Sequence, residues 1–171
     1  MNCLLLLFLS FGNFTLAMPM NGDQTTHIVH EGARGEKDYS KDLRLTLTSF
    51  DNDLKGFAVE IKEYFGETSS NTSWGFIARD QLFTKESLTE FLKKCKENNG
   101  IREKIEVVAG IFDTCKIEET RRGMPTRTQT RWYGFSPIES VIKETITSDY
   151  SGSGGKIYYR TRELSAFSFG K

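Results

Sequence analysis

The feature that most constrains the fold is a succession of short runs rich in β-branched and aromatic residues, each ended by turn-forming residues. The first run, 41–50, alternates Leu43, Leu45 and Leu47 with polar residues, and this two-residue period predicts a half-buried strand. Comparable runs occupy 73–83, 102–120, 126–135, 136–149 and 156–169. Strands at such short spacing pair antiparallel, because a parallel pair needs a long crossover. We therefore expect a mainly β (α+β) fold, a curved antiparallel meander of about seven strands.

The stretch 55–65 fits two structures. Phe57, Val59 and Ile61 alternate as in a strand, but the apolar residues of the stretch also fall on one helical face. Gly56 and the β-branched Val59 favour the strand.

One segment, 84–99, is predicted to be a helix. Ser87 followed by Glu90 is a capping box near its start, and Asn99-Gly100 supplies a left-handed stop. Four apolar residues share one face at helical spacing: Leu88, Phe91, Leu92 and Cys95. We expect this face to pack on the concave face of the sheet, with Cys95 pointing inward.

The first residues are typical of an export signal. Residues 1–17 carry no charge, the apolar block Leu4–Leu9 is shorter than the roughly 20 residues of a membrane span, and Thr15 and Ala17 fit a cleavage site before Met18. The alternative is a buried N-terminal strand. The export hypothesis predicts a periplasmic or extracellular protein without a membrane span.

The remaining chain is expected to form one domain. Residues 18–40 are rich in Gly, Asp, Gln and Thr with little periodicity, so we expect a flexible lead-in, followed by a single domain at 41–171. Outside the signal the cysteines are Cys95 and Cys115, and an even pair in an exported protein predicts a disulfide.

Charge and motifs exclude several function classes. The 23 basic residues balance 23 acidic ones, so there is no global electrostatic case for nucleic acid or for an anionic membrane surface as a partner. His27 and His30 are the only histidines, three apart in the lead-in, and are expected to be solvated instead of binding a metal. No nucleophile elbow or phosphate loop is present. We therefore expect a non-enzymatic protein, with no catalytic residue, metal or cofactor to name.

Two surface features remain. Four arginines, interleaved with threonines, form the one basic cluster and are candidate contacts for an anion, a glycan or a partner: Arg121, Arg122, Arg127 and Arg131. The alternative is a solvated hairpin balanced by Glu118 and Glu119. Asn71 begins a glycosylation sequon in a polar loop.

The stretch EVVAG, Glu106–Gly110, follows the predicted helix and resembles the QVVAG loop of cystatins, the inhibitors of papain-like cysteine proteases. The resemblance implies a protease inhibitor acting through Glu106–Gly110, where the family has an exposed turn. The alternation of Ile105, Val107, Ala109 and Ile111 instead predicts one continuous strand that ends at Cys115. Glu106 stands where cystatins have Gln, and their later Pro-Trp pair is missing.

A longer resemblance covers VVAGIFDTCKIEET, RWYGFSPIESVIKET and YRTRELSAF, in this order. These runs resemble the C-terminal half of exported bacterial proteins labelled TapB-like, which have no established catalysis. The resemblance implies a curved sheet that wraps a helix, as in lipoprotein carriers. It implies an envelope protein that binds an apolar ligand or a protein partner between helix and sheet, with cystatin-like inhibition as the alternative.

Overall fold

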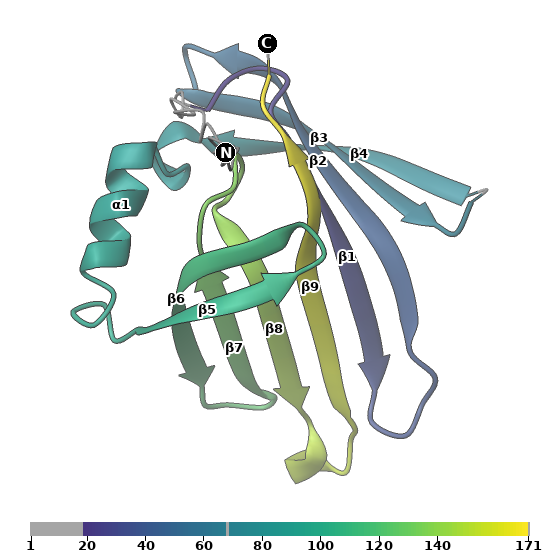
Figure 1. The fold of residues 1–171 in the computed structure, drawn as a ribbon. Helices are drawn as coiled ribbons and strands as arrows, with labels where there is room; N and C mark the ends of the chain where they lie inside the picture. Colours follow the sequence, from purple (N-terminus) through teal and green to yellow (C-terminus); the bar gives the residue numbers. More distant parts are fainter. Residues whose placement is uncertain (1–18, 68, 171) are drawn as a thin grey trace, which may run out of the picture.

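The computed structural model describes residues 19–67 and 69–170, which contain one antiparallel sheet of nine strands (Figure 1). The strands follow the order β4-β3-β2-β1-β9-β8-β7-β6-β5. Their bounds are β1 Gln24–Ala33, β2 Tyr39–Asp51, β3 Gly56–Phe65, β4 Ser69–Ala78, β5 Ile101–Val107, β6 Gly110–Arg121, β7 Thr126–Tyr133, β8 Val141–Asp149 and β9 Ile157–Ser168. The antiparallel, mainly β architecture is confirmed, and 55–65 is a strand, as favoured. The export signal at 1–17 lies outside the described residues.

The predicted lead-in at 18–40 is wrong over most of its length. β1 occupies the middle of the sheet, where it pairs with β2 on one side and β9 on the other. Its inward positions are fully or almost fully buried, yet two of them are polar: Thr25, His27, Val29 and Ala33. The sequence of β1 was therefore interpreted as a solvated segment, because strand prediction depends on alternating apolar residues and the buried face of β1 is partly polar.

The stretch predicted as one strand ending at Cys115 is a hairpin. β5 ends at Val107, Val108 and Ala109 form the turn, and β6 begins at Gly110 with a φ of 132°. Glycine adopts such a positive φ without strain. Cys115 therefore lies within β6 and not at its end. This split, together with β1, accounts for nine strands instead of about seven.

The β5–β6 hairpin folds back over the sheet (Figure 1). The Ala109 amide donates to the Leu164 carbonyl of β9 at 3.2 Å. Val107 packs with Ile142 and Leu164 in a small apolar cluster under the hairpin. The larger core lies on β1–β3 and is closed by two residues from connecting segments, Leu82 and Ile138.

The helix is shorter than predicted. α1 spans Lys85–Lys93, and the chain from 94 to 99 forms turns in place of the last helical turns. Its capping box joins Thr84 and Ser87, not Ser87 and Glu90. Leu88 is the one buried residue of α1. Within the described part of the chain no helix is long and apolar enough to cross a membrane.

Candidate functional site

A cleft of about 450 Å³ separates the helical segment from the sheet. Phe83, just before α1, and Phe91, on α1, form its outer wall, and strands β6 to β9 form its floor. The Phe91 ring lies 5.2 Å from both Phe83 and Tyr133 of β7, between ring centroids. Ile77, Ile117 and Val141 complete the apolar lining. The helix therefore meets the sheet mainly through aromatic rings and leaves the cleft open beside them.

A row of charges lies on the same face of the sheet. Strand register places Arg131, Glu144 and Arg162 side by side on β7, β8 and β9. Arg131 Nε donates to Glu144 Oε1 at 2.8 Å, and Arg162 Nε lies 3.7 Å from Glu144 Oε2. Gln129 also donates to Glu144, at 2.7 Å, and Arg162 Nη1 donates to Glu139 at 2.7 Å. We call Arg131, Glu144, Arg162 and Glu139 the ion row.

The ion row keeps its central carboxylate charged. Burial alone would raise the pKa of Glu144, but Arg162, Arg131 and Gln129 together outweigh it and hold this pKa below its ordinary value. Glu144 is only 7% exposed. An ionised carboxylate so far from water is stable only while both guanidinium groups remain in place.

His27 is buried beside this row. Its side chain is wholly buried, its Nε2 lies 3.5 Å from the Val141 carbonyl, and its Nδ1 has no hydrogen-bond partner. Burial, reinforced by the charge of Arg162, lowers the pKa of His27 to about 3. The imidazole is therefore neutral at physiological pH. The prediction of two solvated histidines is wrong for His27 and confirmed for the exposed His30.

The cleft offers two kinds of recognition group, aromatic rings and charged side chains. The aromatic wall suits an apolar ring or chain, and the ion row suits a polar group that can bond to guanidinium or carboxylate. Among residues 19–67 and 69–170 no group of three or more His, Cys, Asp or Glu side chains is placed to hold a metal.

The four predicted arginines do not form one site. Arg121 and Arg127 face each other across the β6–β7 hairpin, and Arg122 begins the turn between these strands. Arg131 lies further along β7 and pairs with Glu144 in the cleft. No sequence pattern indicated Glu144 and Arg162 as site residues, because only strand register brings them beside Arg131.

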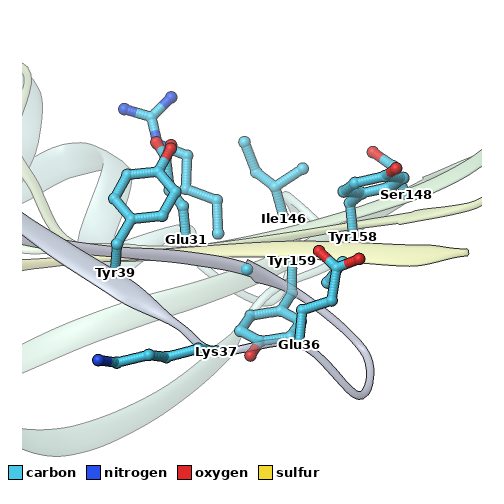
Figure 2. Close-up of a pocket in the computed structure, with 11 residues that line it drawn as sticks. Glu31, Glu36, Lys37, Tyr39, Ile146, Ser148, Tyr158 and Tyr159 are labelled. Atoms are coloured by element: carbon cyan, nitrogen blue, oxygen red, sulfur yellow. The ribbon is translucent and has the colours of Figure 1, made fainter.

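A second hollow, of about 440 Å³, lies toward the other end of β1, β8 and β9. Figure 2 shows Tyr39 and Tyr158 on one side of the sheet and Tyr159 on the other. Arg160 Nε lies 3.1 Å from Glu31, which also accepts from the Tyr39 hydroxyl. Glu31 thus neutralises the charge of Arg160 within this hollow.

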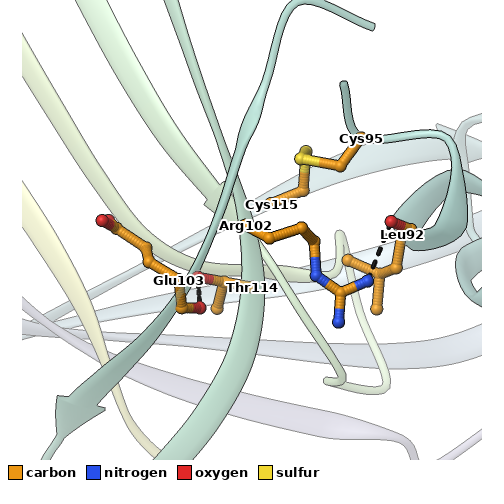
Figure 3. The surroundings of a disulfide bond; sticks show 6 residues. All are labelled: Leu92, Cys95, Arg102, Glu103, Thr114 and Cys115. Carbon is orange, nitrogen blue, oxygen red and sulfur yellow. Dashed lines mark hydrogen bonds between the residues drawn. A yellow bond between two sulfur atoms is a disulfide. The ribbon is translucent and has the colours of Figure 1, made fainter. Parts of the chain in front are cut away.

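The predicted disulfide is confirmed. Cys95 and Cys115 are bonded, with Cα atoms 5.6 Å apart, and neither is exposed. The bond ties the turns after α1 to β6, and beside it Arg102 Nη1 donates to the Leu92 carbonyl at 2.9 Å (Figure 3). A Cβ at Gly100 would lie 2.4 Å from the Cys115 sulfur, so this position requires glycine.

Replacing both cysteines by serine should lower the free energy of unfolding by about 3 kcal/mol without abolishing the fold, because the unfolded chain regains the entropy of the closed loop. Urea denaturation followed by circular dichroism measures this. Dithiothreitol should destabilise the wild type by a similar amount and leave the double variant unchanged. Two reactive thiols in the protein purified without reductant would contradict the bond.

Comparison with known proteins supports the fold and leaves the family open. No protein-family model matches the sequence, and no curated protein matches it. The chain is similar in structure to a Bacteroides fragilis protein described as a "putative exported protein with YmcC-like fold", with a TM-score of 0.50 and 8% identity over 87% of this chain and 96% of that one. At this identity the likeness shows the fold alone. The resemblances to TapB-like proteins and to lipoprotein carriers are not confirmed by these comparisons.

Proposed function

We propose that this is an exported, non-enzymatic binding protein that holds an amphipathic ligand in the cleft between helix and sheet. The observation that carries the proposal is the presence in one cleft of three aromatic rings, the aromatic wall of Phe83, Phe91 and Tyr133, and of the ion row beside Tyr133. The ion row narrows the expected ligand from a purely apolar molecule to one with a polar or charged end.

Three observations support export. The N-terminal sequence has the pattern of a cleavable signal. The disulfide is of the kind that persists in oxidising compartments. The similar Bacteroides fragilis protein is itself described as exported.

A binding role fits the chemistry of the cleft better than catalysis does. Arg131, Glu144, Arg162 and Glu139 are bonded to one another, so each charge is held in place. Fixed, mutually neutralised groups are suited to orienting a bound molecule. The one histidine near them, His27, is wholly buried.

The dye 8-anilinonaphthalene-1-sulfonate tests this proposal, because it joins apolar rings to an anionic group. We expect its fluorescence to rise on binding the folded protein, and Phe91→Ser to weaken the affinity about tenfold by removing one ring of the wall. Arg131→Gln should weaken binding of the sulfonate in the same titration.

The matched control is Phe76→Ser, which removes a 44% exposed ring on β4, outside the cleft. This variant should bind the dye like the wild type. Equal loss in the Phe76 and Phe91 variants, or dye binding only on partial unfolding, would contradict a site in the cleft. Circular dichroism of each variant distinguishes loss of the ring from loss of the fold.

Cystatin-like inhibition is the second candidate, and one observation favours it. Glu106–Gly110 spans a hairpin turn, as in cystatins, and Val108 at its tip is 68% exposed. The other side of the turn is bonded to β9 through Ala109. Tight inhibition of papain that Gly110→Arg abolishes and Phe91→Ser leaves intact would establish this candidate instead.

A further inference from the structure

Three hairpin turns gather at one end of the sheet, at the bottom of Figure 1. They join β1 to β2, β6 to β7, and β8 to β9. α1 lies toward the opposite end of the sheet (Figure 1), and the cleft beside it is lined by Tyr133 and Val141 at those ends of β7 and β8. We call the segments 34–38, 121–127 and 149–156 the turn end.

The turn end carries a local excess of positive charge, although the formal net charge of the whole chain is zero. It has six arginine or lysine side chains and three carboxylates. Glu36 pairs with Lys156, whereas Asp38 and Asp149 accept from neutral donors, the Tyr159 hydroxyl and the Ser151 amide, so the turn end keeps a net charge of three positive units. The excess is therefore not neutralised within the turn end.

Three of these basic residues lie together on the β6–β7 hairpin. Arg121, Arg122 and Arg127 are exposed and form no ion pair with any residue that the structure describes. Arg121 and Arg127 are direct cross-strand partners. Like charges placed directly opposite each other destabilise a sheet, so this pair costs stability unless an anion lies against it.

An apolar residue lies between Arg122 and Arg127 in the chain. Met124, in the β6–β7 turn, is 72% exposed. In the row formed by Arg121 and Arg127, the next residues across the sheet are Ser148 and Tyr158, and the tyrosine is 49% exposed. Cations around an exposed apolar apex, with an aromatic ring nearby, are the composition of a surface that enters the headgroup region of a membrane.

We propose that the turn end docks the protein on a membrane surface that contains anionic phospholipids. The guanidinium groups of Arg121, Arg122 and Arg127 bind lipid phosphates, for which their planar fork is suited. Met124 enters the boundary between headgroups and acyl chains. A water-soluble anion would use the arginines but would gain nothing from Met124, so the lipid surface accounts for both features. In this orientation the cleft faces away from the membrane.

Flotation of the full mature chain with lipid vesicles tests the proposal. The protein should float with vesicles of phosphatidylglycerol and phosphatidylcholine and stay behind with phosphatidylcholine alone. Salt at molar concentration should release it, because screening weakens exposed charges. Arg121→Gln with Arg127→Gln should weaken binding roughly thirtyfold, at the usual contribution of each basic residue near an anionic surface.

Two further variants keep the test decisive. Lys93→Gln with Lys104→Gln removes the same charge from exposed sites on α1 and β5, and should leave vesicle binding unchanged. Met124→Ser keeps every charge and should still weaken vesicle binding. Absence of binding to the anionic vesicles, equal binding to neutral ones, or equal loss in the lysine control would overturn the proposal. Retention on a heparin column together with no effect of Met124→Ser on vesicles would assign the turn end to soluble polyanions instead.

Discussion

Acidification from pH 7 to pH 4 should lower the free energy of unfolding by about 3 kcal/mol through His27 alone. The pKa of this imidazole is about 3 in the folded protein, against 6.5 for an unperturbed histidine, the value that applies to the unfolded chain. Below pH 6.5 the His27 imidazole therefore binds a proton in the unfolded chain but not in the folded protein. The stability contribution is complete above pH 6.5 and is lost as the pH falls toward 3, at about 1.4 kcal/mol per pH unit.

The variant His27→Leu removes this contribution. Leucine is compatible with the site because the cross-strand neighbours of His27 are Leu43 and Leu164, both buried. Urea denaturation at pH 7 and pH 4 measures the difference in unfolding free energy for each protein. Carboxylates also titrate in this range, and they do so in both proteins. The informative comparison is therefore between the losses of unfolding free energy from pH 7 to pH 4, and the loss in His27→Leu should be smaller by about 3 kcal/mol.

The control is His30→Leu, which replaces an exposed histidine of the same strand. Its response to acid should equal that of the wild type. If His27→Leu loses as much stability between pH 7 and pH 4 as the wild type does, the imidazole is not held neutral in the folded protein.

Periodicity predicted the strands whose buried face is apolar. Leu43, Leu45 and Leu47 alternate on β2, and each is almost fully buried. β1 has the same alternation in burial, but Thr25 and His27 occupy inward positions. The alternation of apolar residues therefore cannot identify a strand whose buried face is partly polar.

The β5–β6 turn was missed for a different reason. Val108 and Ala109 are not residues that mark a two-residue hairpin, which is usually signalled by Asn-Gly or a similar pair. Ile105, Val107, Ala109 and Ile111 are also spaced in the sequence like one strand face, but in the hairpin Ile111 pairs with Glu106 on the other face and is 70% exposed. The sequence pattern therefore predicts a single strand where the structure has two.

The candidate site was beyond sequence reasoning because it depends on register. Arg131, Glu144 and Arg162 stand on three successive strands of the sheet, and only their alignment places them in one row. A shift of one residue would move any of them to the other face. The sequence could identify Arg131 as a candidate, but it assigned this residue to the wrong partners.

The variant Glu144→Leu should lower the free energy of unfolding by about 3 kcal/mol or more, because it leaves Arg131 and Arg162 facing each other without their shared carboxylate. The matched control is Glu163→Leu, which breaks the Lys143–Glu163 pair of β8 and β9. Those two side chains are 30% and 29% exposed, so this loss should stay below about 1 kcal/mol. Equal effects in urea denaturation would mean that the row is solvated like any surface pair.

A triple variant then separates stability from binding. Arg131→Met, Glu144→Leu and Arg162→Met together replace the central part of the ion row by apolar side chains, and such replacements often restore or exceed the original stability. We expect the triple variant to recover most of the stability that Glu144→Leu loses, yet to bind the anionic dye at least tenfold more weakly than the wild type. If the triple variant binds the dye unchanged, the ion row has no part in recognition and the ligand contacts the aromatic wall alone. If the triple variant remains as unstable as Glu144→Leu, the ion row is required for stability, and its charges are no evidence for a ligand.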